Sequence, residues 1–272
     1  MIWPFKPQYR KQIARIEIVG LIASDIRKRV LEALETVKER KYPALLLRID
    51  SPGGTVADSQ EIYSALQKLG ETVKIVASFG NISASGGVYV AMGCQNIMSN
   101  PGTITGSIGV ILRGNNLEGL LDKVGVSFKT VKSGPYKDIL AFDRQMTDPE
   151  KQILQDLIDN SYQQFVETVA EARNLTVDTV KTFADGRIFT GQQAVELGIV
   201  DRLGTEEDAR QWACELAGLD PEKTECSTLE KPKPLWSRVL GSSESSSKLS
   251  ASVNWVEFEI STSGLPVWLY RP

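Results

Sequence analysis

The chain has 272 residues, of which 42% are hydrophobic and 24% charged, and its net charge is −3. This composition is typical of a globular protein long enough to bury a sizeable core, and it gives no indication of a nucleic-acid partner. The sequence contains no histidine, which excludes Ser-His-Asp and Cys-His catalytic sites and HExxH zinc sites. Its three cysteines lie far apart and fit neither a metal site nor a disulfide framework.

The N-terminal residues "MIWPFKPQYRKQ" lack the apolar core of a secretory signal, and no run approaches the roughly 20 apolar residues of a membrane span. We therefore expect an intracellular protein without a signal peptide or transmembrane helix, either cytoplasmic or peripheral to a membrane. The apolar start "MIWPF" and the basic residues after it could touch a membrane surface.

The first part of the chain alternates between strands and helices. Apolar runs predict strands at 13–22, 44–49 and 74–78, and helical spacing of apolar residues predicts helices at 24–41 and 57–69. Apolar strands that alternate with helices predict a parallel sheet covered on both faces, and hence an α/β protein.

The pattern then becomes less regular. Glycine-rich turns at 100–110 precede a predicted strand at 127–133. The sequence "TDPE" reads as a capping box that opens a long helix at 148–172. Shorter helices are predicted at 176–183, 191–197 and 205–217.

The composition divides the chain into four parts. Residues 1–11 form an N-terminal tail, 12–222 the main domain, 223–250 a flexible linker rich in Ser, Lys and Pro, and 251–272 an apolar C-terminal segment. We predict that the C-terminal segment docks as an added strand in a substrate groove, either its own or that of a neighbouring subunit, and acts as a regulator. The alternative is a strand that packs on its own domain.

Two glycine-rich turns follow core strands, "RIDSPGG" (48–54) and "SASGG" (83–87). Ligands of open parallel sheets bind at the carboxyl ends of strands, where both turns lie, and free N–H groups there suit a developing oxyanion. Ser85 or Ser83 could be the nucleophile, and the residues alone do not separate them. The alternative is a pair of tight turns in which Ser85 only caps a helix.

Without histidine, a serine nucleophile needs another base, and lysine is available. An ordinary lysine, with a pKa of about 10.4, is protonated, so the working lysine needs surroundings that disfavour its charge. Lys137 follows a Gly-Pro turn in "KSGPYKDI", and Lys132 fits equally well on these grounds.

Five motifs in order resemble the signal peptide peptidase A family (SppA, or protease IV), in its short single-repeat form: "RIDSPGG", "ASGGVYVA", "NPGTITGSIGVI", "SGPYKD" and "ADGRIFTGQQAVELGIVD". The resemblance covers roughly residues 12–215. Members are serine–lysine peptidases with the ClpP/crotonase fold. The resemblance therefore implies a ClpP/crotonase-like spiral of parallel strands with covering helices, here with a long helix and a C-terminal tail.

Carried over by position, the resemblance assigns Ser85 as nucleophile and Lys137 as general base, with Ser107 orienting the lysine. The backbone N–H groups of Gly54 and Gly86 match the oxyanion hole. No metal or organic cofactor is implied. The choice of Ser85 over Ser83 and of Lys137 over Lys132 depends on the resemblance.

The resemblance further implies hydrolysis of apolar peptides, such as remnant signal peptides, through an acyl-enzyme. Family members form ring or dome homo-oligomers whose subunits can complete one another's sites, and the long helix would support such assembly. Two alternatives remain open, a non-catalytic oligomeric scaffold of the same fold and a crotonase-type acyl-CoA enzyme.

Overall fold

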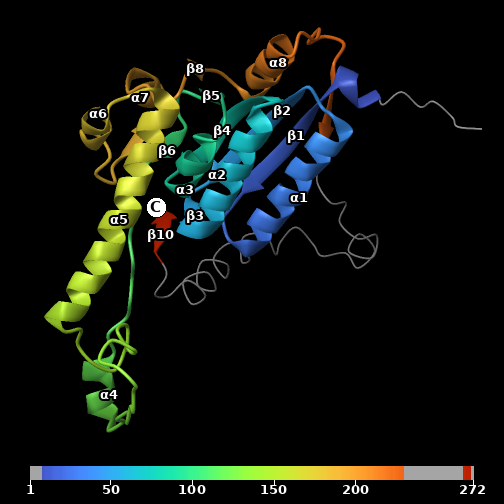
Figure 1. The fold of residues 1–272 in the computed structure, drawn as a ribbon. Coiled ribbons are helices and arrows are strands. Elements are labelled where there is room, and N and C mark those ends of the chain that lie inside the picture. The colour runs from blue at the N-terminus through green and yellow to red at the C-terminus, as the bar shows by residue number, and fades with distance from the viewer. Residues whose placement is uncertain (1–7, 230–265, 271–272) are drawn as a thin grey trace, which may run out of the picture.

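The computed structural model describes residues 8–229 and 266–270 (Figure 1). Its strands are β1 (Gln12–Val19), β2 (Ala44–Ser51), β3 (Gly53–Thr55), β4 (Lys74–Ala84), β5 (Asn96–Ser99), β6 (Ile104–Gly106), β7 (Ile188–Thr190), β8 (Arg202–Leu203), β9 (Glu225–Thr228) and β10 (Val267–Leu269). Its α-helices are α1 (Ser24–Arg40), α2 (Val56–Gly70), α3 (Gly86–Ala91), α4 (Glu118–Val124), α5 (Asp148–Arg173), α6 (Val177–Lys181), α7 (Gly191–Glu196) and α8 (Glu206–Leu216), and a short 3-10 helix spans Gln8–Lys11.

A mostly parallel sheet forms the centre of the molecule, with the strand order β7-β6-β4-β2-β1-β9. The long strand β4 changes partner along its length: residues 76–79 pair with β5, and residues 82–84 pair with β6. The register between β2 and β4 also shifts between Ile49 and Ser51. The sheet therefore turns at the end of β4, which is where the chain enters α3.

Both faces of the sheet are covered by helices. Alternate residues of β2 show this, since they belong to two different hydrophobic core clusters. Leu45, Leu47 and Ile49 join the main core with buried residues of α1, α2 and α3. Ala44 and Leu46 point to the other face and pack with α8, including Trp212. The predicted parallel sheet with helices on both faces is confirmed.

Between β6 and α5 the chain forms an extension that contains α4, and helix α5 connects this extension to the body of the molecule, which the sheet and its covering helices form (Figure 1). A capping box between Thr147 and Glu150 begins the helix, as the sequence predicted. Towards its end, Phe165, Val166 and Val169 are fully buried against the body. The extension instead exposes many large apolar side chains: Leu117, Leu120, Val124, Val126, Phe128, Val131, Tyr136 and Phe142.

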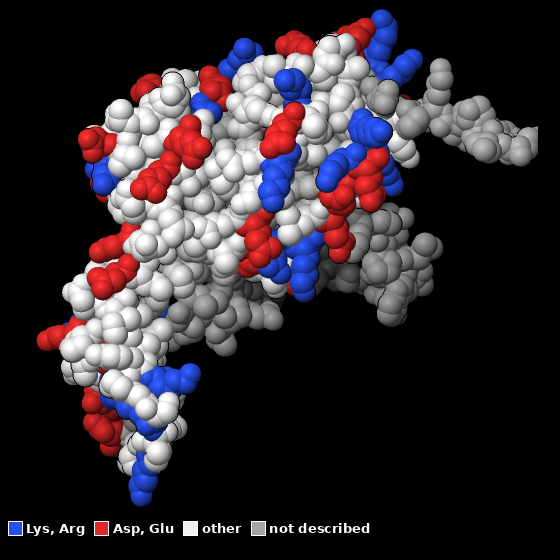
Figure 2. Space-filling view, in the orientation of Figure 1, with Lys and Arg blue, Asp and Glu red and all other residues white. Residues whose placement is uncertain are grey.

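The surface of the body is different. Figure 2 shows Lys and Arg side chains interspersed with Asp and Glu over the face that α1 and α2 form. No helix among the described residues is long and apolar enough to cross a membrane. The apolar start of the chain, at residues 1–5, lies outside the described residues.

Some local predictions were wrong. Residues 127–133 form no strand and are exposed, because no described strand lies beside them to share backbone hydrogen bonds. Residues 225–228, expected in the linker, form β9 and pair in parallel with β1 from Gln12 to Arg15. Most of the expected linker and of the segment 251–272 lies outside the described residues, apart from 266–270.

Candidate active site

Ser85 stands at the turn between β4 and α3 in a backbone conformation that few non-glycine residues adopt. Its φ is 52° and its ψ is −114°. The turn is held because the Ser85 N–H donates to the Gly106 carbonyl at 2.8 Å, and the Ser85 carbonyl accepts from the Tyr89 N–H at 3.0 Å. Backbone strain of this kind clusters at active sites, where the surrounding structure fixes it.

The Ser85 hydroxyl is buried but has no hydrogen-bond partner among the described residues. A buried polar group usually finds a partner, and each exception in a native structure needs an explanation, of which a catalytic role is one. Ser83 also has a buried hydroxyl without a partner. Ser83, however, lies within β4 with ordinary strand pairing to Thr105, whereas Ser85 stands past the end of the strand.

Gly54 and Gly86 lie against each other beside Ser85. A Cβ atom on Gly86 would lie 3.0 Å from the Gly54 nitrogen. A Cβ on Gly54 would come within 1.8 Å of the Ile22 carbonyl oxygen. The close approach of the Ile22 and Gly54 backbones therefore requires glycine at position 54. The structure thus brings together the nucleophile and the two oxyanion-hole residues that the resemblance assigns.

Ser107 occupies the same edge of the sheet. The paired residues Ala84 and Gly106 end β4 and β6, and Ser85 and Ser107 directly follow them. Ser107 is buried with a φ of 51°, and its N–H donates to the Arg187 carbonyl at 2.7 Å. It lines a cavity of about 550 Å³ whose wall includes Ile111, Tyr162, Leu269 and Tyr270.

Strand β10 lies across this site. It pairs antiparallel with β3, with Trp268 opposite Gly54. A Cβ on Gly53 would lie 2.0 Å from the Trp268 carbonyl oxygen, and one on Gly86 would lie 3.1 Å from it. The Trp268 carbonyl therefore lies between the two glycine turns, against Gly86, the residue that follows Ser85. No local sequence pattern predicts this register, because it depends on pairing between residues far apart in the chain.

Lys137 is exposed and belongs to the extension, which leads away from the body in Figure 1. Its side chain makes no hydrogen bond or ion pair with the described residues, and the structure does not bring it to the Ser85 hydroxyl of the same chain. Lys132 differs, because its Nζ is 2.6 Å from Asp138 Oδ1 and donates to the Pro135 carbonyl at 3.0 Å. Only Lys137 of the two therefore has an amine without a partner among the described residues.

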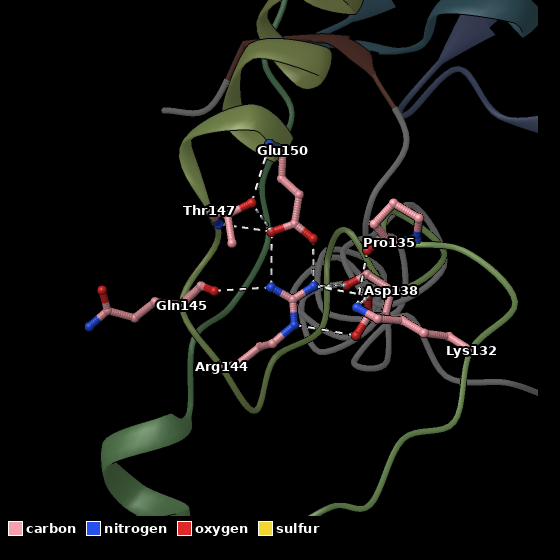
Figure 3. A network of polar contacts seen from close by, with 7 residues as sticks. All are labelled: Lys132, Pro135, Asp138, Arg144, Gln145, Thr147 and Glu150. Carbon is pink, nitrogen blue, oxygen red and sulfur yellow. Dashed lines mark hydrogen bonds and ion pairs between the residues drawn. The ribbon is translucent and has the colours of Figure 1, made fainter.

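A network of charges fixes the turn that carries Lys137 (Figure 3). Arg144 donates to both carboxylate oxygens of Glu150, at 2.9 and 2.5 Å, and to Asp138 at 2.9 Å. Asp138 directly follows Lys137, and Glu150 belongs to the first turn of α5. The network therefore ties the Lys137 turn to the beginning of the long helix. Arg144 carries no distinctive sequence signal, because ion pairs at this spacing are common on protein surfaces.

Hydrogen bonds lower the pKa of two carboxyl groups in this network. Arg144 is the main cause for Glu150, with the Thr147 N–H next, and its pKa falls to about 2. Arg144 and then Lys132 lower the pKa of Asp138 to about 2. The same carboxylates raise the pKa of Arg144. All three groups therefore remain ionised across the neutral range.

Acid should weaken this network at a definite pH. Because the folded-state pKa of Glu150 is lowered, its stabilising effect is complete above the ordinary carboxyl pKa of about 4.3 and disappears as the pH falls towards 2. We expect Glu150→Gln to lower the free energy of unfolding at pH 6 and to change it much less at pH 2.5, measured by urea unfolding. Lys151→Gln, at an exposed residue of the same turn, serves as the control. An equal effect of Glu150→Gln at both pH values would contradict the assignment.

Among the described residues no group of three or more acidic or cysteine side chains could hold a metal ion. The three cysteines are unpaired, and burial raises the pKa of the Cys94 thiol. The site thus brings a serine hydroxyl beside two glycine N–H groups, and no described lysine amine lies within hydrogen-bond distance of that hydroxyl.

More than half of the chain matches a known protein family. Residues 67–220 match the family described as "Peptidase family S49". A Synechocystis sp. protein named "putative protease" is 69% identical to this chain, and the match covers 100% of both chains.

More distant relatives match part of their length. "Serine protease SPPA, chloroplastic" of Arabidopsis thaliana is 34% identical, over 66% of this chain and 27% of the relative. "Protease 4" of Salmonella typhi is 36% identical, over 66% of this chain and 29% of the relative. The chain therefore spans less than a third of these two proteins.

Solved structures show the fold. A ClpP1 mutant from Listeria monocytogenes matches 72% of this chain and 93% of its own, with 16% identity and a TM-score of 0.51. A membrane-bound stomatin-specific protease, 1510-N, matches 82% of this chain and 99% of its own, with 15% identity and a TM-score of 0.56. The predicted ClpP-like α/β fold is confirmed.

Proposed function

Because the chain belongs to peptidase family S49, we propose that it hydrolyses apolar peptides, such as remnant signal peptides, with Ser85 as nucleophile and Lys137 as general base. The observation that carries the proposal is the position of a peptide carbonyl, that of Trp268, between Gly54 and Gly86. Gly86 directly follows Ser85, whose buried hydroxyl has no hydrogen-bond partner among the described residues. A substrate carbonyl in that position would be within reach of the nucleophile.

The reaction follows from these groups. Neutral Lys137 takes the proton of Ser85, and the serine oxygen attacks the peptide carbonyl carbon. The N–H groups of Gly54 and Gly86 stabilise the negative oxygen of the tetrahedral intermediate. The protonated lysine then gives its proton to the leaving amine, and an acyl-enzyme remains. Water, activated by the same lysine, hydrolyses the ester and restores Ser85.

The lysine of this site comes from a neighbouring copy of the chain in our proposal. Lys137 is exposed on the extension, which leads away from the body that holds its own Ser85 (Figure 1). The extension also exposes large apolar side chains, including Phe128 and Val131, which favours contact with another subunit. A closed ring of copies would place each extension against the site of the next.

Burial between subunits would also make Lys137 a better base. An amine removed from water favours its neutral form, which is the form that accepts the serine proton. Assembly would therefore complete the site both in geometry and in proton affinity.

The test compares two lysines that lie five positions apart. We expect Lys137→Ala to lower kcat/KM on a leader-like apolar peptide by at least ~100-fold, since general-base catalysis contributes about 10²–10⁴. Lys132→Ala is the matched control and should retain most of the activity, with circular dichroism confirming both folds. Loss with Lys132→Ala alone would assign the base to Lys132. A wild-type chain that cleaves no peptide would favour the scaffold alternative.

A further inference from the structure

The Trp268 side chain fills an aromatic pocket next to the site. Its indole is fully buried and stacks on Tyr89, with ring centroids 3.9 Å apart and planes 28° apart. Phe165 forms a second wall at 4.8 Å from the indole. Tyr89 comes from α3, the helix that Ser85 begins, and Phe165 comes from α5. The pocket is therefore built on the same turn that presents the nucleophile.

Further contacts hold the Tyr89 wall of the pocket in place. The Thr168 hydroxyl donates to the Tyr89 hydroxyl at 3.3 Å, and the rings of Tyr63 and Phe165 pack on that of Tyr89, at 5.1 and 5.2 Å. A pocket whose walls are fixed in this way is suited to recognise a side chain by shape.

The backbone register identifies which substrate position the pocket serves. The Tyr270 N–H donates to the Pro52 carbonyl at 2.7 Å, and the Val56 N–H to the Pro266 carbonyl at 3.5 Å. Hydrogen-bonded pairs alternate in an antiparallel ladder, which makes Trp268 and Gly54 the hydrogen-bonded pair between these contacts. The residue whose carbonyl occupies the oxyanion hole is the residue before the scissile bond, so its side chain fills the S1 subsite.

The other edge of β10 is also held. Val267 and Ile111 exchange both backbone hydrogen bonds, at 3.0 and 3.1 Å. A peptide that adds to the edge of a strand is the arrangement of β-augmentation, in which main-chain bonds give affinity and side-chain pockets give specificity. β10 is held here as a substrate segment would be.

The recognition in this pocket is apolar. The indole Nε1 of Trp268 is buried and has no hydrogen-bond partner among the described residues. An aromatic side chain without an N–H would leave nothing unpaired there, so phenylalanine should fit at least as well as tryptophan. The pocket therefore selects a ring and not a polar group.

We propose that Tyr89 and Phe165 form the S1 subsite of this peptidase, that the subsite selects an aromatic residue before the scissile bond, and that Trp268 of the chain's own tail competes with substrate for it. This inference rests on the function proposed above for Ser85. It assigns a substrate class to the site, and it gives the C-terminal segment the role of a competing occupant.

Binding of a peptide tests the subsite without depending on catalysis. The protein is the full chain carrying Ser85→Ala, which removes the nucleophile, and Trp268→Ala, which empties the pocket. The probes are the peptide of residues 262–272, TSGLPVWLYRP, and the same peptide with Trp268→Phe or Trp268→Ala, measured by calorimetry. We expect the tryptophan and phenylalanine peptides to bind at least ~10-fold more tightly than the alanine peptide. Equal affinity of the three peptides would overturn the inference.

A kinetic measurement adds the competition. In a chain with Ser85 intact, Trp268→Ala should lower the apparent KM for a peptide with phenylalanine before the scissile bond, because the competing ring is gone. An unchanged KM would exclude the tail as a competitor. Ring-dependent binding by a chain that hydrolyses no peptide would overturn the proposed function and leave the pocket, whereas hydrolysis indifferent to the residue at this position would do the reverse.

Discussion

Replacing Ser85 with alanine is expected to lower peptide hydrolysis by at least ~10³-fold while the fold is retained, because loss of a nucleophile removes the acyl-enzyme route. The Ser85 hydroxyl makes no hydrogen bond among the described residues, so its removal leaves no partner unpaired. The measurement is kcat/KM on an apolar peptide, with thermal unfolding as the check on structure.

Ser83→Ala is the matched control for this prediction. The Ser83 hydroxyl is also buried and unpartnered, but it lies inside β4 and not at the strained turn. We expect Ser83→Ala to keep kcat/KM within a few-fold of the wild type. Activity lost with Ser83→Ala and kept with Ser85→Ala would move the nucleophile to Ser83.

Mixing two inactive variants is expected to restore activity. If the lysine comes from a neighbouring subunit, a site works when a subunit with Ser85 meets a neighbour with Lys137. After dissociation and random reassembly of equal amounts of Ser85→Ala and Lys137→Ala chains, about a quarter of the sites satisfy both conditions. We expect about a quarter of the wild-type kcat per chain, where each variant alone gives almost none.

Reassembly of the double variant, Ser85→Ala with Lys137→Ala, mixed with wild type controls for dilution of active subunits. The same random assembly again gives about a quarter of the sites a working pair in trans, whereas a site completed within one chain would give about half. No recovery with the single variants and half recovery with the double variant would contradict a shared site.

The central sheet could be predicted because its signals are local. The runs at 44–49 and 74–78 are apolar on both faces and alternate with amphipathic helices, a pattern typical of buried parallel strands. The capping box at Thr147 and Glu150 likewise lies within one turn, and the structure contains it. Each of these elements is determined by neighbours in sequence.

The short strands could not be predicted, because their partners lie far away in the chain. β9 is four residues long in a polar stretch and forms through pairing with β1. β10 has three residues whose register depends on Gly53 and Gly54. Residues 127–133 show the opposite case, since their strand-like sequence finds no edge to join among the described residues.

The candidate site divides in the same way. Its glycine turns follow core strands, so the approach of Ser85 to Gly54, Gly86 and Ser107 follows from the sheet. The position of Lys137 depends instead on the whole extension and on the ion pairs that Arg144 makes with Asp138 and Glu150. The aromatic pocket combines α3, α5 and the tail, and a tyrosine among small residues in "GGVYVA" was its one sequence signal.

The backbone bonds on both edges of β10 restrict which proteins such a groove can accept. Val267 bonds to Ile111 on one edge, while Tyr270 bonds to Pro52 on the other. A protein substrate, called a client below, must therefore enter as a single extended strand whose main-chain N–H and C=O groups are unbonded on both sides. A helix or an interior strand of a folded sheet does not meet this condition. For a folded client, the cleavage rate would follow the free energy of opening that segment, so the client's own local stability would determine its lifetime.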